Sequence, residues 1–159
     1  MIALEWLVAV ALLIVVFGLL RSRRRRSNWI VVDGSNVLHW ERDTPDIQSL
    51  LHVLGALKSE GFVPVVWFDA NVGYLISDRY LGPRPLAAAL GLPVKHVFVA
   101  SKGTPADPLL LVGARKLKAR VVTNDRFRDW VDDFPEIQNP GFLVRGRMGK
   151  DDFELELSD

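Results

Sequence analysis

The sequence predicts a three-layer α/β/α fold with a mainly parallel central sheet. Short apolar strands recur along the chain, and segments with helical periodicity separate them. Most of these strands are apolar throughout, which is typical of strands buried on both faces. Strands that alternate with helices at this spacing form parallel sheets covered by helices. With 159 residues, 49% of them hydrophobic, the chain can form one domain with a substantial core.

The first 20 residues predict a transmembrane anchor. Residues 2–20 are apolar apart from Glu5. A helix of this length, at ~1.5 Å per residue, spans about 28 Å, close to the thickness of a bilayer core. A cleaved signal peptide would have a positively charged start and a small-residue cleavage site, and a buried core helix would carry a polar stripe. The segment has none of these features, so we expect residues 1–20 to form a membrane anchor.

A cluster of arginines follows this segment directly. Arg21 and Arg23 to Arg26 place five positive charges within six residues. The positive-inside rule then predicts a single-pass membrane protein with its N-terminus outside and its folded part in the cytoplasm. Residues 21–28 are then expected to form a basic juxtamembrane linker, and residues 29–159 the folded domain.

The charge of the folded part excludes nucleic-acid binding through bulk positive charge. The whole chain has a net charge of +1, but from Ser27 onward 15 Lys and Arg stand against 18 Asp and Glu, a net charge of −3. A polyanion would therefore need a local basic surface or metal ions. The chain has no cysteine, which excludes disulfides, a thiol nucleophile and cysteine-ligated zinc.

The domain is expected to begin with a buried strand that stops at a polar motif. Ile30–Val32 form the strand, and Asp33-Gly34-Ser35-Asn36 follow it. Thr44 is expected to cap the next helix, with Pro45 at the first helical position. After Pro45, apolar residues recur at helical spacing, and Gly61 is expected to end the helix.

The second predicted strand, Phe62–Phe68, also ends in an acid, Asp69. Pro64 indicates that this strand starts late or lies near an edge. The remaining predicted elements are two short helices within Asn71–Leu90, a strand at Val97–Val99, a helix from Thr104 to Lys118, a strand at Arg120–Thr123, a helix from Asn124-Asp125 that stops at Pro135, and strands at Phe142–Arg145 and Phe153–Leu157.

Acidic residues follow several of these strands. Asp33, Asp69 and Asp125 come directly after a strand, and Asp107 lies in the first turn of a helix. In a right-handed β-α-β arrangement these points share the edge formed by the carboxyl ends of the strands. Asp129 lies four residues beyond Asp125, so a helix starting at Asp125 would place both carboxylates on one face. The sequence therefore predicts several carboxylates in one crevice.

Such a cluster favours a metal ion. Two carboxylates ~4 Å apart repel by about 4 kcal/mol at an effective dielectric near 20. Either some of them stay protonated, with raised pKa values, or a divalent cation holds them. Oxygen ligands without His or Cys favour Mg²⁺ or Mn²⁺ over zinc. Taken singly, Asp125 also fits a helix cap and Asp107 a first-turn acid.

Other chemistries fit the sequence less well. A phosphatase of the haloacid dehalogenase type needs a second Asp two residues after the first, where this chain has Ser35. No glycine-rich phosphate loop follows the first strand. Trp40, Trp67 and Trp130 are expected in the core rather than as platforms for stacked bases, although Trp40 lies in the loop over the proposed site.

Three motifs resemble the PIN-like NYN ribonucleases, above all the Regnase (MCPIP) type. They are Val32-Asp33-Gly34-Ser35-Asn36-Val37, Ala106-Asp107 and Val122-Thr123-Asn124-Asp125-Arg126-Phe127-Arg128-Asp129. The similarity covers about Trp29 to Asp152. Two departures stand out: the zinc finger of the animal proteins is absent, and Ala106 replaces one of two adjacent acids. Whether one or two metal ions bind is left open.

The resemblance implies an endoribonuclease that depends on Mg²⁺ (or Mn²⁺) and cleaves single-stranded or loop RNA. Carried over by position, the metal-binding acidic centre comprises Asp33, Asp107, Asp125 and Asp129. Asn36 would orient Asp33 or a metal-bound water, and Asp69 is left open as a further metal ligand. From charge and placement, the candidates for contact with the RNA phosphates are Lys102, Arg126, Arg128, Arg145, Arg147 and Lys150.

Two alternative functions use the same residues. One is a PIN-like module with weak or no catalysis that binds RNA or a protein. The other is a phosphatase or DNA nuclease on the same acidic site, since neither the fold nor the acids define the substrate. RNA and, through residues 2–20, the membrane are the expected partners, and a homodimer is left open as an alternative to a monomer.

Overall fold

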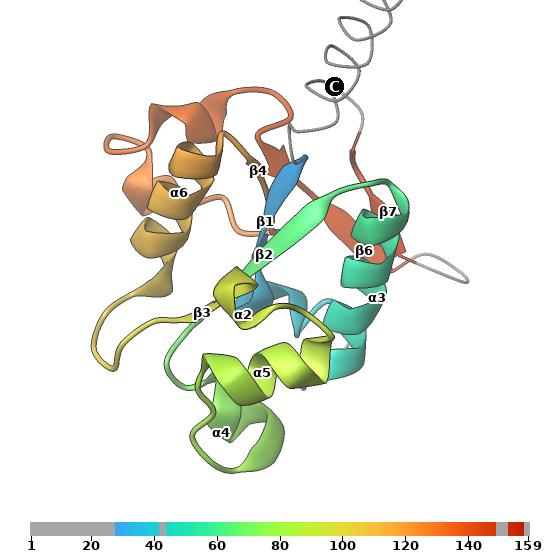
Figure 1. Cartoon of the computed structure of the whole chain (residues 1–159). Coiled ribbons are helices and arrows are strands. Elements are labelled where there is room, and N and C mark those ends of the chain that lie inside the picture. Colours follow the sequence, from blue (N-terminus) through green and yellow to red (C-terminus); the bar gives the residue numbers. More distant parts are fainter. Residues whose placement is uncertain (1–27, 42–43, 149–152, 158–159) are drawn as a thin grey trace, which may run out of the picture.

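A five-stranded parallel sheet lies at the centre of the structure, a computed structural model that describes residues 28–41, 44–148 and 153–157. The strand order is β3-β2-β1-β4-β5, and every neighbouring pair is parallel. Figure 1 labels the strands β1 to β4 of this sheet. The strands are β1 (Trp29–Asp33), β2 (Val63–Phe68), β3 (Val97–Val99), β4 (Arg120–Val122) and β5 (Leu143–Val144). This confirms the predicted mainly parallel sheet. The order reverses between β1 and β4, the switch point at which open sheets bind ligands.

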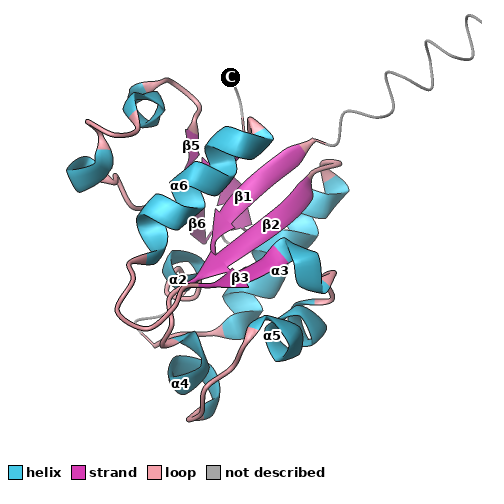
Figure 2. Cartoon of the chain, turned by 60° about the vertical axis from the view of Figure 1, so that its left-hand side comes forward, coloured by secondary structure: helices cyan, strands magenta, loops and turns pink. Residues whose placement is uncertain are grey.

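Helices cover both faces of this sheet (Figure 2). One face carries α2 (Gly34–Val37), α3 (Ile47–Ser59) and α5 (Pro83–Leu90), which pack with Ile30 and Val32 of β1 in the larger core cluster. The other face carries α6 (Ala106–Leu117), which packs with Val31 in a second cluster. The short elements are α4 (Val72–Ser77) and the 3₁₀ helices η1 (Val94–His96), η2 (Arg128–Trp130) and η3 (Pro135–Gln138). The three layers thus follow from the alternating directions of side chains in β1.

The helix α3 begins two residues later than predicted. Asp46, not Thr44, is the N-cap of α3, because its carboxylate accepts a hydrogen bond from the backbone N–H of Gln48 (2.9 Å). The backbone N–H of Asp46 donates to the carbonyl of Leu38 (2.8 Å), which holds the cap residue in extended conformation against the loop before it. Pro45 therefore lies outside the helix.

The proline in β2 does not mark an edge strand. β2 lies between β3 and β1, but β3 pairs only with Val66 to Phe68. Pro64 therefore faces no neighbouring strand on the β3 side, and its missing N–H removes no sheet hydrogen bond there. The prediction that β2 lies near an edge is therefore wrong for the strand as a whole, but it holds for the residues before Val66, which have no partner in β3.

The end of the described chain forms a second, two-stranded sheet. β6 (Gly146–Met148), which the sequence did not reveal, pairs antiparallel with β7 (Phe153–Leu155). Gly146 lies against Trp40, and a Cβ at this position would overlap the indole ring. The small sheet is thereby placed close to the loop that follows α2.

No helix in residues 28–41, 44–148 and 153–157 is long and apolar enough to cross a membrane. The predicted anchor, residues 1–20, and nearly all of the predicted linker lie outside the described residues.

Candidate functional site

Asp33 ends the central strand β1 and is almost completely buried, with 8% of its surface exposed. Two hydrogen bonds hold its carboxylate. The backbone N–H of Asn36 donates to Oδ1 (3.1 Å), and the hydroxyl of Thr123, the residue after β4, donates to Oδ2 (2.9 Å). A carboxylate held from both neighbouring segments has a fixed orientation at the switch point of the sheet.

The chain leaves β1 through a tight turn into α2. A Cβ at Gly34 would overlap the buried ring of Phe68, so only glycine lets the turn pack against β2. The hydroxyl of Ser35 accepts a hydrogen bond from the backbone N–H of Asp69 (2.9 Å). The small residues of the motif therefore connect the end of β1 to the end of β2, and they bring Asp69 toward Asp33.

The Asn36 side chain connects two loops instead of contacting Asp33. Its Oδ1 accepts hydrogen bonds from the indole N–H of Trp40 (2.8 Å) and from the backbone N–H of Asn124 (2.9 Å). Asn36 thus orients Asp33 through its backbone N–H, while its side chain fixes the loop after β4. This loop carries Asp125.

The helix predicted from Asn124-Asp125 is absent. The carboxylate of Asp125 accepts a hydrogen bond from the N–H of Phe127 (2.7 Å), and Phe127 adopts left-handed backbone geometry at φ 47°. This turn buries the Phe127 ring in the second core cluster, and only the short η2 follows. Asp125 and Asp129 therefore do not share a helix face, and Pro135 begins η3 rather than ending a helix.

The acids interact electrostatically at this edge of the sheet. Burial, and to a lesser extent the charges of Asp107 and Asp69, raise the pKa of Asp33 to about 7, although its two hydrogen bonds lower it. Burial also raises the pKa of Asp107, and the charges of Asp125, Asp69 and Asp129 add to this effect. All five candidate acids thus lie within electrostatic reach of Asp33 or Asp107. Asp69, whose role the sequence left open, belongs to the same cluster.

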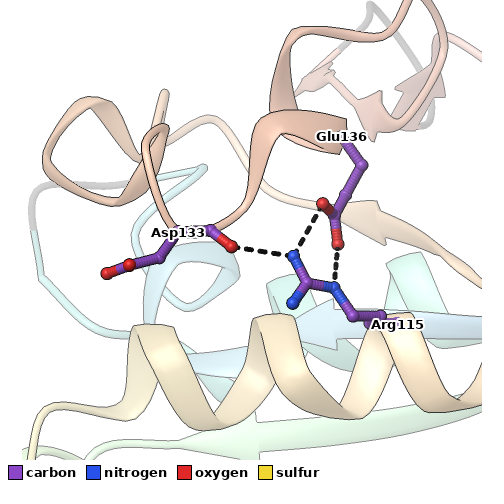
Figure 3. A network of polar contacts seen from close by, with 3 residues as sticks. All are labelled: Arg115, Asp133 and Glu136. Carbon is purple, nitrogen blue, oxygen red and sulfur yellow. Dashed lines mark hydrogen bonds and ion pairs between the residues drawn. The ribbon is translucent and has the colours of Figure 1, made fainter.

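An ion pair on α6 holds the segment that carries Asp129. Arg115 donates two hydrogen bonds to the carboxylate of Glu136 (2.6 and 2.9 Å) and one to the backbone carbonyl of Asp133 (2.9 Å; Figure 3). Both partners follow η2, whereas Asp107 lies in the first turn of α6. The two segments that supply these acids are therefore fastened to each other.

The donor set fits a hard divalent cation. In the described part of the chain, no three acidic or histidine side chains are already arranged around a common metal position. The oxygen donors nevertheless include a buried carboxyl, Asp33, that loses its proton only near pH 7 in the absence of a cation. A cation would favour the ionised form. Mg²⁺ is commonly held by one or two carboxylates plus waters, so a small number of these acids is sufficient.

The predicted RNA-binding residues differ in what they contact. Lys102 and Arg126 are exposed in the loops that follow β3 and β4, and Arg128 is exposed at the start of η2. Arg145 donates to the backbone carbonyls of Thr123 (3.2 Å) and Asp125 (2.6 Å), so its guanidinium holds the site loop. Arg147 forms an ion pair with Glu154, and Lys150 lies outside the described residues.

Sequence reasoning missed three residues that position the site. They are the buried Thr123, the loop residue Asn124, and Trp130, whose side chain hydrogen-bonds Asp107. Thr123 and Asn124 follow β4, and Asp33 ends the neighbouring β1, so a position at the end of a strand was the available signal. Trp130 gave no comparable signal.

The fold is similar to part of a known RNA enzyme. No family model and no curated protein matches the sequence. Two solved structures of the nuclear proteinaceous RNase P 2 (PRORP2) from A. thaliana do match. The first is 21% identical, has a TM-score of 0.56, and the match covers 82% of this chain and 29% of that chain. The second is 23% identical, has a TM-score of 0.54, and the match covers 96% of this chain and 35% of that chain. The chain thus spans about a third of the length of these proteins. This likeness shows that the chain shares its α/β fold with part of these proteins.

Proposed function

We propose that the chain is a metal-dependent endoribonuclease that cleaves single-stranded or loop RNA. The observation that carries the proposal is Asp33, a buried carboxyl at the switch point whose pKa is raised to about 7 beside further acids. Strongly perturbed acids in such a position are typical of catalytic sites. The shared fold with a proteinaceous RNase P supports RNA as the substrate.

Each group has a defined role in this proposal. The acids that would hold Mg²⁺ or Mn²⁺ come from Asp33, Asp107, Asp125 and Asp129, with Asp69 as a further candidate. One or two of these carboxylates would bind the ion directly, and water molecules would fill the other positions. When bound, the ion activates a water molecule and neutralises charge on the phosphate. Thr123 and the backbone N–H of Asn36 keep Asp33 oriented. The exposed cations that would bind the RNA phosphates are Lys102, Arg126 and Arg128.

Metal removal tests this function directly. The purified full chain, kept in mild detergent, is incubated with labelled single-stranded RNA or DNA of the same sequence. We expect RNA cleavage with Mg²⁺ or Mn²⁺, none with EDTA, and recovery when Mg²⁺ is added in excess. Cleavage that resists EDTA would contradict the proposal. RNA binding without product would instead indicate a non-catalytic module, and preferential cleavage of DNA would indicate a DNA nuclease.

We also propose that residues 2–20 anchor this nuclease in a membrane, with the N-terminus outside and the domain in the cytoplasm. The apolar stretch and the arginines behind it support this arrangement. The full chain should sediment with membranes, resist high salt and alkaline washing, and dissolve only in detergent. A chain lacking residues 2–20 should stay in the supernatant. Release of the full chain by salt alone would contradict the anchor.

A further inference from the structure

A groove of about 630 Å³ lies beside α6, on the face of the sheet to which Asp33 belongs. It is lined by α6, η1 and the strands β1 to β3. The register places Trp67 of β2 opposite Asp33 of β1, and Phe98 of β3 opposite Trp67. Figure 2 shows β2 and β3 extending beyond α6 on this face. One row across the sheet therefore leads from the buried acid to two aromatic rings in the groove.

Part of the groove wall is aromatic. Trp67 and Phe98 stack with their ring centres 4.5 Å apart and their planes 14° apart, and Phe98 is 38% exposed at the edge strand. Trp29 and His96 form a second aromatic pair, edge to face, at 5.2 Å. Burial and the neighbouring Lys95 lower the pKa of His96, which favours the neutral form of the imidazole ring.

The charges around the groove are positive. Lys95 from η1 and Lys116 from α6 line it, and none of the described residues that line it is acidic. This contrasts with the folded part of the chain as a whole, which has a net charge of −3. The groove thus meets the requirement for a local basic surface, and an anionic ligand complements it.

The groove leads toward the acidic site along α6. Leu109, Val112 and Lys116 are spaced three and four residues apart and line the groove from one face of the helix. Asp107 lies two residues before Leu109, in the first turn of the same helix. Gly113 lets α6 pack closely on Trp67, since a Cβ there would come within 3.1 Å of the indole nitrogen.

We propose that this groove holds unpaired nucleotides of single-stranded RNA beside the acidic site, with bases stacked on the aromatic rings and phosphates near Lys95 and Lys116. The inference rests on the proposed function and names where the substrate lies. Aromatic platforms flanked by cations are how proteins bind single strands. An acidic protein segment would also suit the lysines, but it would not need flat rings.

Two variants of the groove test the inference. Binding of a labelled single strand of roughly 12 nucleotides, a length that spans one such groove, is measured by fluorescence anisotropy on the full chain in detergent with EDTA, so that no cleavage occurs. Phe98→Leu keeps an apolar side chain and removes the flat ring, and should weaken binding about tenfold. The double variant Lys95→Gln, Lys116→Gln should have a less steep plot of log K, the RNA association constant, against log[salt]. The slope should be smaller in magnitude by about 1.4, which corresponds to two phosphate contacts. Lys58→Gln, on α3 at the opposite face, is the control and should bind RNA like the wild type.

The outcomes separate this inference from the proposed function. Wild-type affinity in both groove variants, or no RNA binding by the wild type, would overturn the inference. If Phe98→Leu binds RNA like the wild type while the lysine variant binds it less tightly, the lysines contact phosphates but no base stacks on Phe98, and the inference is overturned. In Mg²⁺, a dinucleotide should be cleaved equally by the wild type and the groove variants, whereas longer RNA should be cleaved more slowly by the variants. If the wild type cleaves no RNA at all, the proposed function itself fails.

Discussion

The Asp33→Asn substitution is expected to abolish RNA cleavage and, at the same time, to stabilise the metal-free protein above pH 7. The amide carries no charge and binds cations poorly, so the main ligand of the proposed metal site is lost. Metal-ion catalysis contributes several kcal/mol to transition-state stabilisation, and a loss of about 4 kcal/mol corresponds to a rate on the order of 10³-fold lower. Few other single substitutions in this chain should have a comparable effect.

The gain in stability follows from the raised pKa of Asp33. The folded pKa is about 7, against an ordinary value of 3.8 in the unfolded chain. The contribution of this carboxyl to the free energy of unfolding is therefore full below pH 3.8 and declines as the pH rises toward 7. The total change is about 4 kcal/mol. Because Asn does not ionise, the variant should match the wild type near about pH 4 and exceed it at about pH 8.

Urea unfolding in EDTA at several pH values measures this difference, and cleavage in Mg²⁺ measures the loss of activity. Added Mg²⁺ should raise the melting temperature of the wild type but not of Asp33→Asn. Asp78→Asn provides the matched control, since Asp78 is exposed and its left-handed backbone also suits Asn. An active Asp33→Asn protein, or a stability difference that does not change with pH, would contradict the assignment.

The sequence predicted the features that depend on local pattern. Apolar strands that end in Asp33 and Asp69 were sufficient to place these acids at one sheet edge, because parallel strands all present their carboxyl ends there. Most helices were also predicted, since their apolar stripes repeat at helical spacing. These parts follow from periodicity and chain direction alone.

The parts that could not be predicted depend on the competition between two local conformations or on contacts between residues far apart in the sequence. After β4, the Asp125 carboxylate could cap a helix or close a turn. The turn forms because it buries the Phe127 ring in the second core cluster. One of the two partners of the Asn36 side chain, the backbone N–H of Asn124, lies 88 residues further along the chain. Trp67 was expected in the core, but part of its ring lines a groove, because strand order, which the sequence does not show, puts β3 at the edge.

Asn36→Ala is the second substitution with a large expected effect. It removes the oxygen that accepts hydrogen bonds from Trp40 and from the backbone of Asn124. The loss of these two accepted hydrogen bonds should lower the free energy of unfolding by about 1–3 kcal/mol. The loop that carries Asp125 also loses its connection to the segment after β1. We therefore expect cleavage to fall roughly 10- to 100-fold, as is typical when a group that orients a metal ligand is removed.

Asn36→Asp separates the hydrogen bonds from the charge at this position. The carboxylate keeps an acceptor for both donors, so most of the stability lost in Asn36→Ala should return. It also adds a negative charge beside Asp33, which should raise the pKa of Asp33 further and increase the Mg²⁺ concentration needed for half-maximal cleavage. Thermal melts and Mg²⁺ titrations of both variants measure these effects, with Asn139→Ala, an exposed asparagine before β5, as the control. If Asn36→Ala and Asn36→Asp were equally unstable, the accepted hydrogen bonds could not be what holds the two loops together.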